Sequence, residues 1–265
     1  MEVGIMLFIN CKECPVEEQI EILKSIGVRR TFLAASHPRL DEVMKAVNDA
    51  GMICDNFHGA FNEPDGYKMN DMHKDGEAGD IMLERIMNNI TTCVKHKIPL
   101  LVLHISGEPP STTINDIGDY RYKKLGDFAR ENGVTLVFEN TAGHLENFKH
   151  VSELIPDAKF CYDNGHEFLF SRDANLLSYF GERLGALHIT DNNGTHDNHF
   201  IPFDGIIDFE KVSKEIADNG YNGTLMLELM YGGEYAEKMT YREFAVKAKL
   251  AGERIIEMVE KYINN

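Results

Sequence analysis

Short runs of apolar residues alternate along the chain with longer stretches in which apolar positions recur every three or four residues. The first pattern is typical of buried strands, and the second of amphipathic helices. Eight such pairs follow one another from end to end. The predicted strands cover residues 3–10, 31–36, 52–61, 99–106, 134–141, 159–166, 185–192 and 223–230. This regular alternation predicts a parallel sheet with helices between its strands.

The ends of the predicted helices carry residues that favour those positions. Pro15 stands at the start of the first helix, and a helix from about Tyr241 to Tyr262 closes the chain. Four helices end at a glycine, as a left-handed cap requires. These glycines are Gly27, Gly51, Gly133 and Gly220.

Eight evenly spread units in 265 residues, with no linker or low-complexity stretch, predict a single (β/α)₈ TIM barrel domain over residues 1–265. The chemistry of such a fold lies at the C-terminal ends of the strands. An open doubly wound sheet is the competing architecture. No GxGxxG motif follows the first strand, which argues against its dinucleotide-binding version.

The composition of the chain indicates which partners and which cellular compartment to expect. The net charge of −16 disfavours a nucleic-acid binder, because such proteins need lysine and arginine on phosphates. The N-terminal stretch lacks the basic flank of a secretory signal, and no apolar run approaches the roughly 18 residues of a membrane helix. Five cysteines, an odd number, suit a reducing cytoplasm. We therefore expect a cytoplasmic protein, compatible with a homo-oligomer, that does not bind nucleic acid.

Residues able to bind a metal or move a proton stand at the ends of six successive predicted strands. These are His58, His104, Glu139, Asp163, His188 and Glu228. In a parallel barrel, side chains at these positions face one common site. Histidines in strands can also be hydrogen-bonded residues of the core. The alternative interpretation of His58 and His104 is therefore that they are core residues rather than ligands.

The acidic residues are harder to explain as core. A carboxylate directly after Leu-Val-Phe (Glu139), or between two leucines (Glu228), is costly to bury without a partner. A salt bridge is the alternative, but no lysine or arginine stands at the other strand ends. We therefore predict a divalent-metal site formed by Glu139, Asp163, His188 and Glu228. Three carboxylates and one imidazole favour Mn²⁺ or Mg²⁺, and Co²⁺ or Zn²⁺ are compatible. We interpret the Cys11–Cys14 pair as packing or chance.

Several motifs in this chain together resemble those of the xylose isomerase-like barrels. That superfamily includes sugar-phosphate isomerases and epimerases and also endonuclease IV. The motifs occur in the family order and span the predicted units. They are FENTAG (138–143), YDNGH (162–166), LHITDN (187–192), HDNHFIPFDGIIDF (196–209) and LMLEL (225–229).

The resemblance to the isomerases and epimerases implies a site with one metal ion, held by the four residues named above. It implies that Glu139 and Glu228 also face the reacting carbons of a sugar, sugar phosphate or keto-polyol. One glutamate would remove a proton beside the carbonyl, giving an enediolate that the metal stabilises, and the other would return it. The expected substrate-binding residues are His58, His104, His166, Asn198 and His199.

Two alternatives remain open at this stage. The endonuclease IV pattern implies three zinc ions and adds His58, His104, His166, Asp197 and His199 to the ligands. The acidic charge and the lack of a basic, aromatic loop disfavour it. A non-catalytic sugar- or metal-binding relative is the other.

The family's usual PGxGxIDF reads PFDGIIDF here (202–209), and some epimerases use an arginine near position 198. Loop 62–79 is a candidate lid or an ordinary solvated loop.

Overall fold

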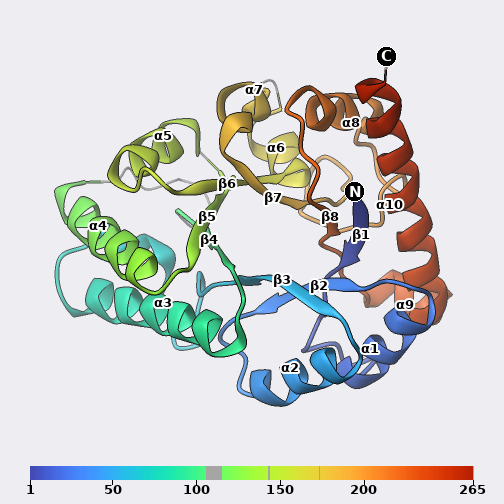
Figure 1. Ribbon diagram of the computed structural model, residues 1–265, viewed down its shortest axis with the longest axis horizontal. Coiled ribbons are helices and arrows are strands. Elements are labelled where there is room, and N and C mark those ends of the chain that lie inside the picture. The colour runs from blue at the N-terminus through green and yellow to red at the C-terminus, as the bar shows by residue number, and fades with distance from the viewer. Residues whose placement is uncertain (106–114, 143, 173, 265) are drawn as a thin grey trace. The chain divides into compact units, whose positions relative to one another are not determined.

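A computed structural model describes residues 1–105, 115–142, 144–172 and 174–264 (Figure 1). Strands and helices alternate along these residues. The strands are β1 (Glu2–Ile5), β2 (Arg30–Ala34), β3 (Ile53–His58), β4 (Leu100–His104), β5 (Thr135–Glu139), β6 (Lys159–Asp163), β7 (Leu184–His188) and β8 (Thr224–Leu227). The α-helices are α1 (Val16–Ser25), α2 (Leu40–Asp49), α3 (Glu77–His96), α4 (Asp116–Glu131), α5 (His144–Leu154), α6 (Asn164–Phe170), α7 (Leu176–Phe180), α8 (Phe209–Asp218), α9 (Gly233–Lys238) and α10 (Tyr241–Ile263). Two 3₁₀ turns are η1 (Met69–His73) and η2 (Gly181–Arg183).

The chain divides into two compact units. Unit 1 comprises Met1–Leu33, His37–Cys54 and Tyr162–Asn265, and unit 2 comprises Ala34–Ser36 and Asp55–Cys161. Strands β3 and β6 contribute residues to both.

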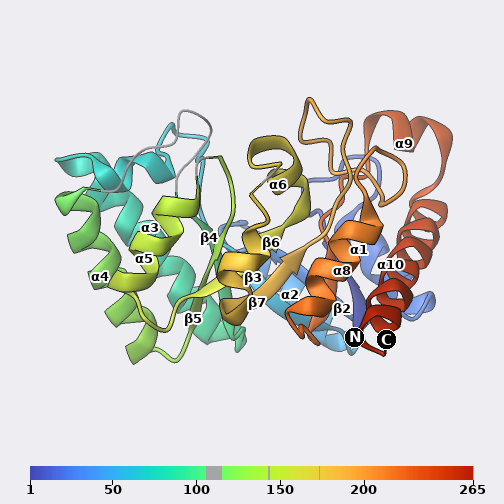
Figure 2. The ribbon, with the colours of Figure 1, turned by 90° about the horizontal axis from the view of Figure 1, so that it is seen from above.

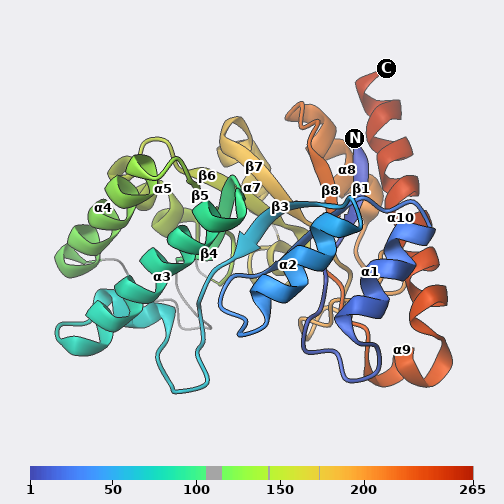
Figure 3. The ribbon, with the colours of Figure 1, turned by 60° about the horizontal axis from the view of Figure 1, so that its bottom comes forward.

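In unit 2, parallel pairing joins β3 to β4, β4 to β5, and β5 to β6. The register sets His104 opposite Glu139, so β4 and β5 end at the same level. Helix α3 packs against α4 and η1, and α4 packs against α5 (Figure 3). This register places the last side chains of neighbouring strands together.

In unit 1, β1 pairs in parallel with both β2 and β8. Just beyond β7, the Ile189 amide donates to the Met226 carbonyl at 2.8 Å, and the Glu228 amide donates to the Ile189 carbonyl at 3.1 Å. The long helix α10 packs against α8, α1 and β1 (Figure 2). The backbone of Glu228 is therefore fixed beside the end of β7, which carries His188.

Each of the eight predicted strands is present, and each is shorter than its apolar run. In residues 159–166 a helix replaces part of the predicted strand, because β6 stops at Asp163 and helix α6 begins at once. The carboxylate of Asp163 accepts from the His166 amide and starts this helix. The sequence prediction also missed α9 and η1. The predicted glycine caps are correct, since Gly27 and Gly51 have φ values of +84° and +69°.

The η1 part of the loop of residues 62–79 is packed against its own unit, while residues 64–66 and 74–77 are exposed. Met69 and Met72 in η1 are fully buried. The guanidinium of Arg121, itself 3% exposed, donates to the carbonyls of Met72 at 3.0 Å and Lys74 at 2.6 Å. Opening this loop as a lid would break these bonds. Within the described residues, every helix is too short or too polar to cross a membrane.

Candidate functional site

The ends of β3, β4 and β5 bring two histidines and a buried glutamate together in unit 2. Nε2 of His58 lies 3.4 Å from Oε2 of Glu139, and Nε2 of His104 lies 3.6 Å from the same oxygen. Glu139 is 1% exposed. One ligand atom from each of the three residues lies within 4.8 Å of the others, so the group has the spacing of a metal site. The predicted residues of this unit therefore form one cluster.

Hydrogen bonding assigns a role to each nitrogen of the His58 ring. Nδ1 lies 3.0 Å from the carbonyl oxygen of Gly59, and a carbonyl only accepts, so Nδ1 carries the proton. In the neutral ring Nε2 then presents a lone pair. That lone pair faces Nε2 of His104 at 3.3 Å, which can donate to it. The ring of Phe61 covers both imidazoles, with centroids at 5.2 and 4.7 Å.

Unit 1 brings together the ends of β6 and β7 and the residue after β8. Asp163 and His188 are both fully buried. Nδ1 of His188 lies 3.2 Å from Oε2 of Glu228, and its ring stacks on Phe32 with centroids 4.6 Å apart. The stacking and the close carboxylate fix the imidazole in one orientation. This unit therefore contains three of the four predicted metal ligands.

A second histidine–carboxylate group in unit 1 involves the loop after β7. Oδ2 of Asp197 lies 3.1 Å from Nε2 of His166 and 3.1 Å from Nε2 of His199. Nδ1 of His199 lies 3.2 Å from the backbone carbonyl of Glu228 and donates to it. Asp197 thus joins helix α6 to the loop that carries His199.

Electrostatics make the Asp197–His199 contact an ion pair. Burial lowers the pKa of His199, but the hydrogen bond that its ring donates to Asp197 and the charge of Glu228 outweigh burial and raise that pKa to about 9. Burial raises the pKa of Asp197, but its hydrogen bonds with His166 and His199 hold the pKa well below its usual value. At neutral pH the site therefore contains an imidazolium donor beside Glu228.

The remaining motif residues hold these side chains in place. The side-chain amide of Asn164 donates to the Thr190 carbonyl and accepts from the Thr190 amide, both at 2.9 Å. A Cβ at Gly165 would lie 2.4 Å from Cγ2 of Thr190, so this contact requires glycine. The YDNGH and LHITDN motifs thus lock the ends of β6 and β7 to each other.

Asp191, which is fully buried, organises the loop after β7. Its carboxylate accepts from the amides of Phe203, Gly205 and Ile207 at 2.8–3.1 Å. Phe203, which stands where the usual family motif has glycine, keeps a left-handed backbone with φ +75°. The guanidinium of Arg254 lies over its ring at 4.0 Å, so packing offsets the strain of this conformation.

The other residues that the sequence analysis discussed include Asn198 and the Cys11–Cys14 pair. Asn198 is half-buried, and its side-chain oxygen accepts from the Asn193 amide at 3.1 Å, outside the histidine groups. Cys11 donates its thiol to the Tyr231 carbonyl at 3.6 Å, and burial raises the pKa of Cys14 to about 12. Both thiols therefore stay protonated, in agreement with packing. Asp197 is absent from the predicted isomerase site and appears in the sequence analysis only among the endonuclease IV ligands, although the HDNH stretch (196–199) was its signal.

Comparison with known proteins identifies the fold and the kinds of relative. Fructoselysine 3-epimerase of Escherichia coli O157:H7 is 26% identical over 40% of this chain and 42% of its own length. Inosose dehydratase of Clostridium perfringens is 28% identical over 48% of this chain and 50% of its own. The chain thus spans about half the length of these curated relatives. The structure of the IOLI protein with a bound zinc atom superposes with a TM-score of 0.74 at 14% identity, covering 99% of both chains.

A family model decides the classification. The model for the xylose isomerase-like TIM barrel matches residues 19–247, which is most of the chain. The (β/α)₈ barrel predicted from the alternation of strands and helices is therefore confirmed. The chain belongs to the xylose isomerase-like TIM barrel family.

Proposed function

We propose that this protein is a divalent-metal-dependent isomerase or epimerase of a sugar, sugar phosphate or keto-polyol. The observation that carries the proposal is a pair of glutamates at strand ends, each beside histidines. Glu139 ends β5, is buried, and lies within 3.6 Å of two imidazoles. Glu228 directly follows β8, with Oε2 3.2 Å from His188. In an enzyme of this fold, such positions face the reacting substrate.

The proposed metal ligands are Glu139, Asp163, His188 and Glu228. The first three are buried, and a set of three carboxylates with one imidazole fits a hard divalent cation. Mn²⁺ or Mg²⁺ suits this set best, with Co²⁺ and Zn²⁺ also acceptable. When bound, such an ion polarises a carbonyl and stabilises negative charge on its oxygen.

The two glutamates would move the proton. One takes a proton from the carbon beside the carbonyl, and the other returns it, to the opposite face when the product is an epimer. The imidazolium of His199, whose two N–H groups bond to Asp197 and to the Glu228 carbonyl, would contribute a positive charge near a substrate oxygen. The other proposed substrate contacts are His58, His104, His166 and Asn198.

The relatives support this chemistry at the level of class. One is named as a sugar epimerase and another as a dehydratase of an inosose. Epimerisation beside a carbonyl and loss of water beside a carbonyl can share one first step, which is removal of the α-proton. We therefore assign the transfer of the α-proton to Glu139 and Glu228. The identity of the sugar is to be determined by experiment.

Solvent exchange tests the proposal directly. The purified protein is incubated in D₂O with saturating Mn²⁺ and a panel of ketoses, their phosphates and inososes, and α-deuterium is followed by NMR. We expect deuterium at the carbon beside the carbonyl for at least one sugar. A panel without exchange, with metal bound, would contradict the proposal.

The one-domain organisation over residues 1–265, the cytoplasmic location and a homo-oligomeric state stay predictions of the sequence.

A zinc phosphodiesterase is the second candidate, and one observation favours it. His58 and His104 both contact Glu139, and His166 and His199 both contact Asp197. Each unit therefore contains a histidine-rich group. The net charge of −16 speaks against a duplex substrate. Nicking of duplex DNA with an abasic site, together with three tightly bound zinc ions per chain, would favour this candidate.

A further inference from the structure

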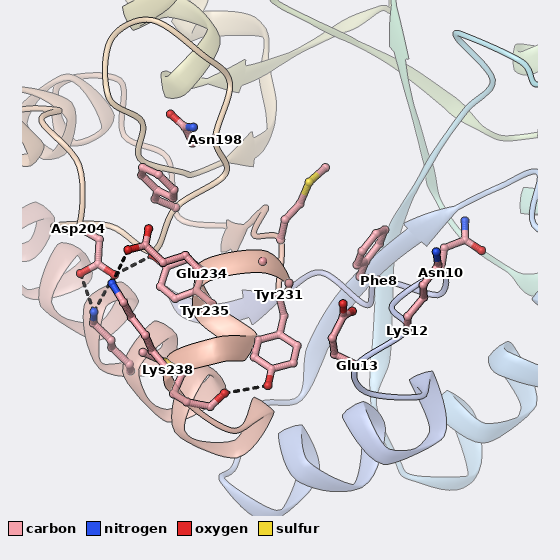
Figure 4. Close-up of a pocket in the computed structure, with 16 residues that line it drawn as sticks. Phe8, Asn10, Lys12, Glu13, Asn198, Asp204, Tyr231, Glu234, Tyr235 and Lys238 are labelled. Carbon is pink, nitrogen blue, oxygen red and sulfur yellow. Dashed lines mark hydrogen bonds and ion pairs between the residues drawn. The ribbon is translucent and has the colours of Figure 1, made fainter.

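A cavity of about 710 Å³ lies in unit 1, among the loops that follow β1 and β8 (Figure 4). Four aromatic side chains line it, together with the amides of Asn10 and Asn198. The aromatic residues are Phe8, Phe200, Tyr231 and Tyr235. The proton transfer proposed above uses no residue of this cavity except Asn198.

The cavity adjoins the proposed acid–base residue of unit 1. Its wall includes Met230, two residues after Glu228, and the Met230 amide donates to the His199 carbonyl at 3.2 Å. Asn198 lies in the same wall and directly precedes His199 in the chain. The chain segments that carry Glu228 and His199 therefore both contribute to the cavity wall, through Met230 and Asn198.

The charges around the cavity balance. Three lysines and three carboxylates line it, and two pairs are direct ion pairs, Lys238 with Glu234 and Lys247 with Asp204 at 2.6 Å. The hydroxyl of Tyr235 also donates to Asp204, at 2.7 Å. A phosphate or nucleotide would find no excess of positive charge here. A neutral ligand with hydroxyl groups fits better, because amides and carboxylates bind hydroxyls and aromatic faces cover the C–H face of a sugar ring.

The volume of about 710 Å³ leaves room for a sugar ring, because ligand sites of about 300–1,000 Å³ hold whole small molecules. From this, and resting on the function proposed above, we propose that the substrate is a glycosylated ketose. Its ketose part reacts at the strand-end glutamates, and its second, neutral sugar ring occupies this cavity.

Gly232 offers a way to fill the cavity without touching the reacting residues. Its φ of 164° is extended backbone that any residue adopts. A Cβ built there would have Oε2 of Glu13, at 4.0 Å, as its nearest neighbour, so a side chain at this position has room to enter the cavity. Gly232→Leu adds a branched side chain and Gly232→Ala only a methyl group, which makes the second variant a matched control.

The experiment compares fructose with isomaltulose, in which glucose is attached to O6 of fructose and the carbons beside the carbonyl stay free. Exchange of the α-proton gives kcat/KM for each sugar, and calorimetry gives its binding. We expect the wild type to prefer isomaltulose by about 10-fold or more, which is about 1.4 kcal/mol. Gly232→Leu should lose that preference with fructose unchanged, and Gly232→Ala should keep it.

Two results separate the failure of this inference from the failure of the proposed function. Exchange with both sugars at equal kcat/KM, or an undiminished preference in Gly232→Leu, overturns the second-ring assignment and leaves the enzyme proposal intact. Binding of isomaltulose that Gly232→Leu abolishes supports the cavity assignment, even if no sugar of the whole ketose, phosphate and inosose panel exchanges, which would contradict the enzyme proposal. No binding of isomaltulose overturns the cavity assignment, whether or not another sugar of the panel exchanges.

Discussion

The Nε2 atoms of His58 and His104 lie 3.3 Å apart, at the ends of adjacent parallel strands. Both also lie within 3.6 Å of one oxygen of Glu139. The same geometry suits two roles, because two imidazoles and a carboxylate can hold a metal ion or can bind adjacent hydroxyls of a sugar. Our account gives the histidines the second role, and the two roles have different consequences on mutation.

Exchanging single histidines separates the ligands from the substrate contacts. His188→Ala removes a proposed ligand, so we expect the affinity for Mn²⁺ to fall by at least about 100-fold, the upper end of what even outer partners of a metal cost. His58→Ala should leave Mn²⁺ affinity within a few fold and weaken sugar binding instead. Calorimetric titration of the metal-free protein measures the first effect, and sugar binding in saturating Mn²⁺ measures the second. An equal loss of metal affinity in both variants would make His58 a ligand.

Metal content is the second prediction. The proposed ligand set holds one ion, so elemental analysis of native protein should give about one divalent metal per chain. After chelation, thermal stability should fall, and Mn²⁺ or Mg²⁺ should restore it, because an ion that binds only the folded chain stabilises it. Three zinc ions that resist chelation would instead support the phosphodiesterase candidate.

Asp191→Asn should destabilise the protein by about 2–4 kcal/mol. The carboxylate of Asp191 accepts three backbone N–H groups of the loop after β7, and an amide nitrogen in its place would face some of those donors. Asp208→Asn is the control, because Asp208 caps α8 by accepting from Glu210 and Lys211, and asparagine caps equally well. Urea unfolding at neutral pH measures both variants. Equal stability of the two would remove Asp191 as the organiser of the loop.

Glu215→Gln should stabilise the protein at neutral pH. Burial raises the pKa of Glu215, and the charge of nearby Glu167 raises it further. The folded pKa therefore lies above the unfolded value. Stability from the protonated carboxyl is full below the unfolded pKa, about 4.3, and is lost as pH rises through the folded pKa. Glutamine mimics the protonated form and avoids that loss.

Thermal unfolding at two pH values checks this prediction. We expect Glu215→Gln to melt higher than wild type at pH 7, by about 2–4 °C for each kcal/mol, and to match it near pH 4. The exposed Glu237→Gln is the control and should change neither value appreciably. A variant that is less stable at pH 7 would mean that the ionised carboxylate of Glu215 is favourable in the folded protein.

The hydrophobic pattern predicted the strands and most helices because the strands are short apolar runs, whereas the helices have apolar residues at every third or fourth position. It did not locate the end of β6, because the polar run of residues 163–166 does not by itself distinguish a continuing strand from the start of a helix. The helix begins at Asn164 because the Asp163 side chain caps it, and this is a local hydrogen bond rather than a periodic signal. Short α9 was missed for a related reason, as none of its residues is buried.

Candidate residues at strand ends were predictable because parallel strands end on a common side. The groupings within each unit agree with that expectation, with Glu139 beside His104 and Glu228 beside His188. The role of Asp197 was not predictable from its position, since it lies in a loop and acts only through His166 and His199. The left-handed Phe203, held by Arg254 from a helix more than forty residues away, depends likewise on tertiary contacts.

The central claim is that Glu139 and Glu228 move protons as well as bind metal. Glutamine keeps an oxygen that can bind metal but has no useful basicity. With saturating Mn²⁺, we expect Glu139→Gln and Glu228→Gln each to lose on the order of 10²-fold or more in kcat, as general-base catalysts do. One of the two should still exchange the α-hydrogen with D₂O without forming product, because only the group that returns the proton is gone.

The most direct measurement is therefore deuterium uptake by NMR, alongside product formation, for the wild type and both variants at saturating metal. The account predicts exchange and product in the wild type, exchange alone in one variant, and neither in the other. Full turnover by either variant at saturating Mn²⁺ would contradict the role of that glutamate in proton transfer.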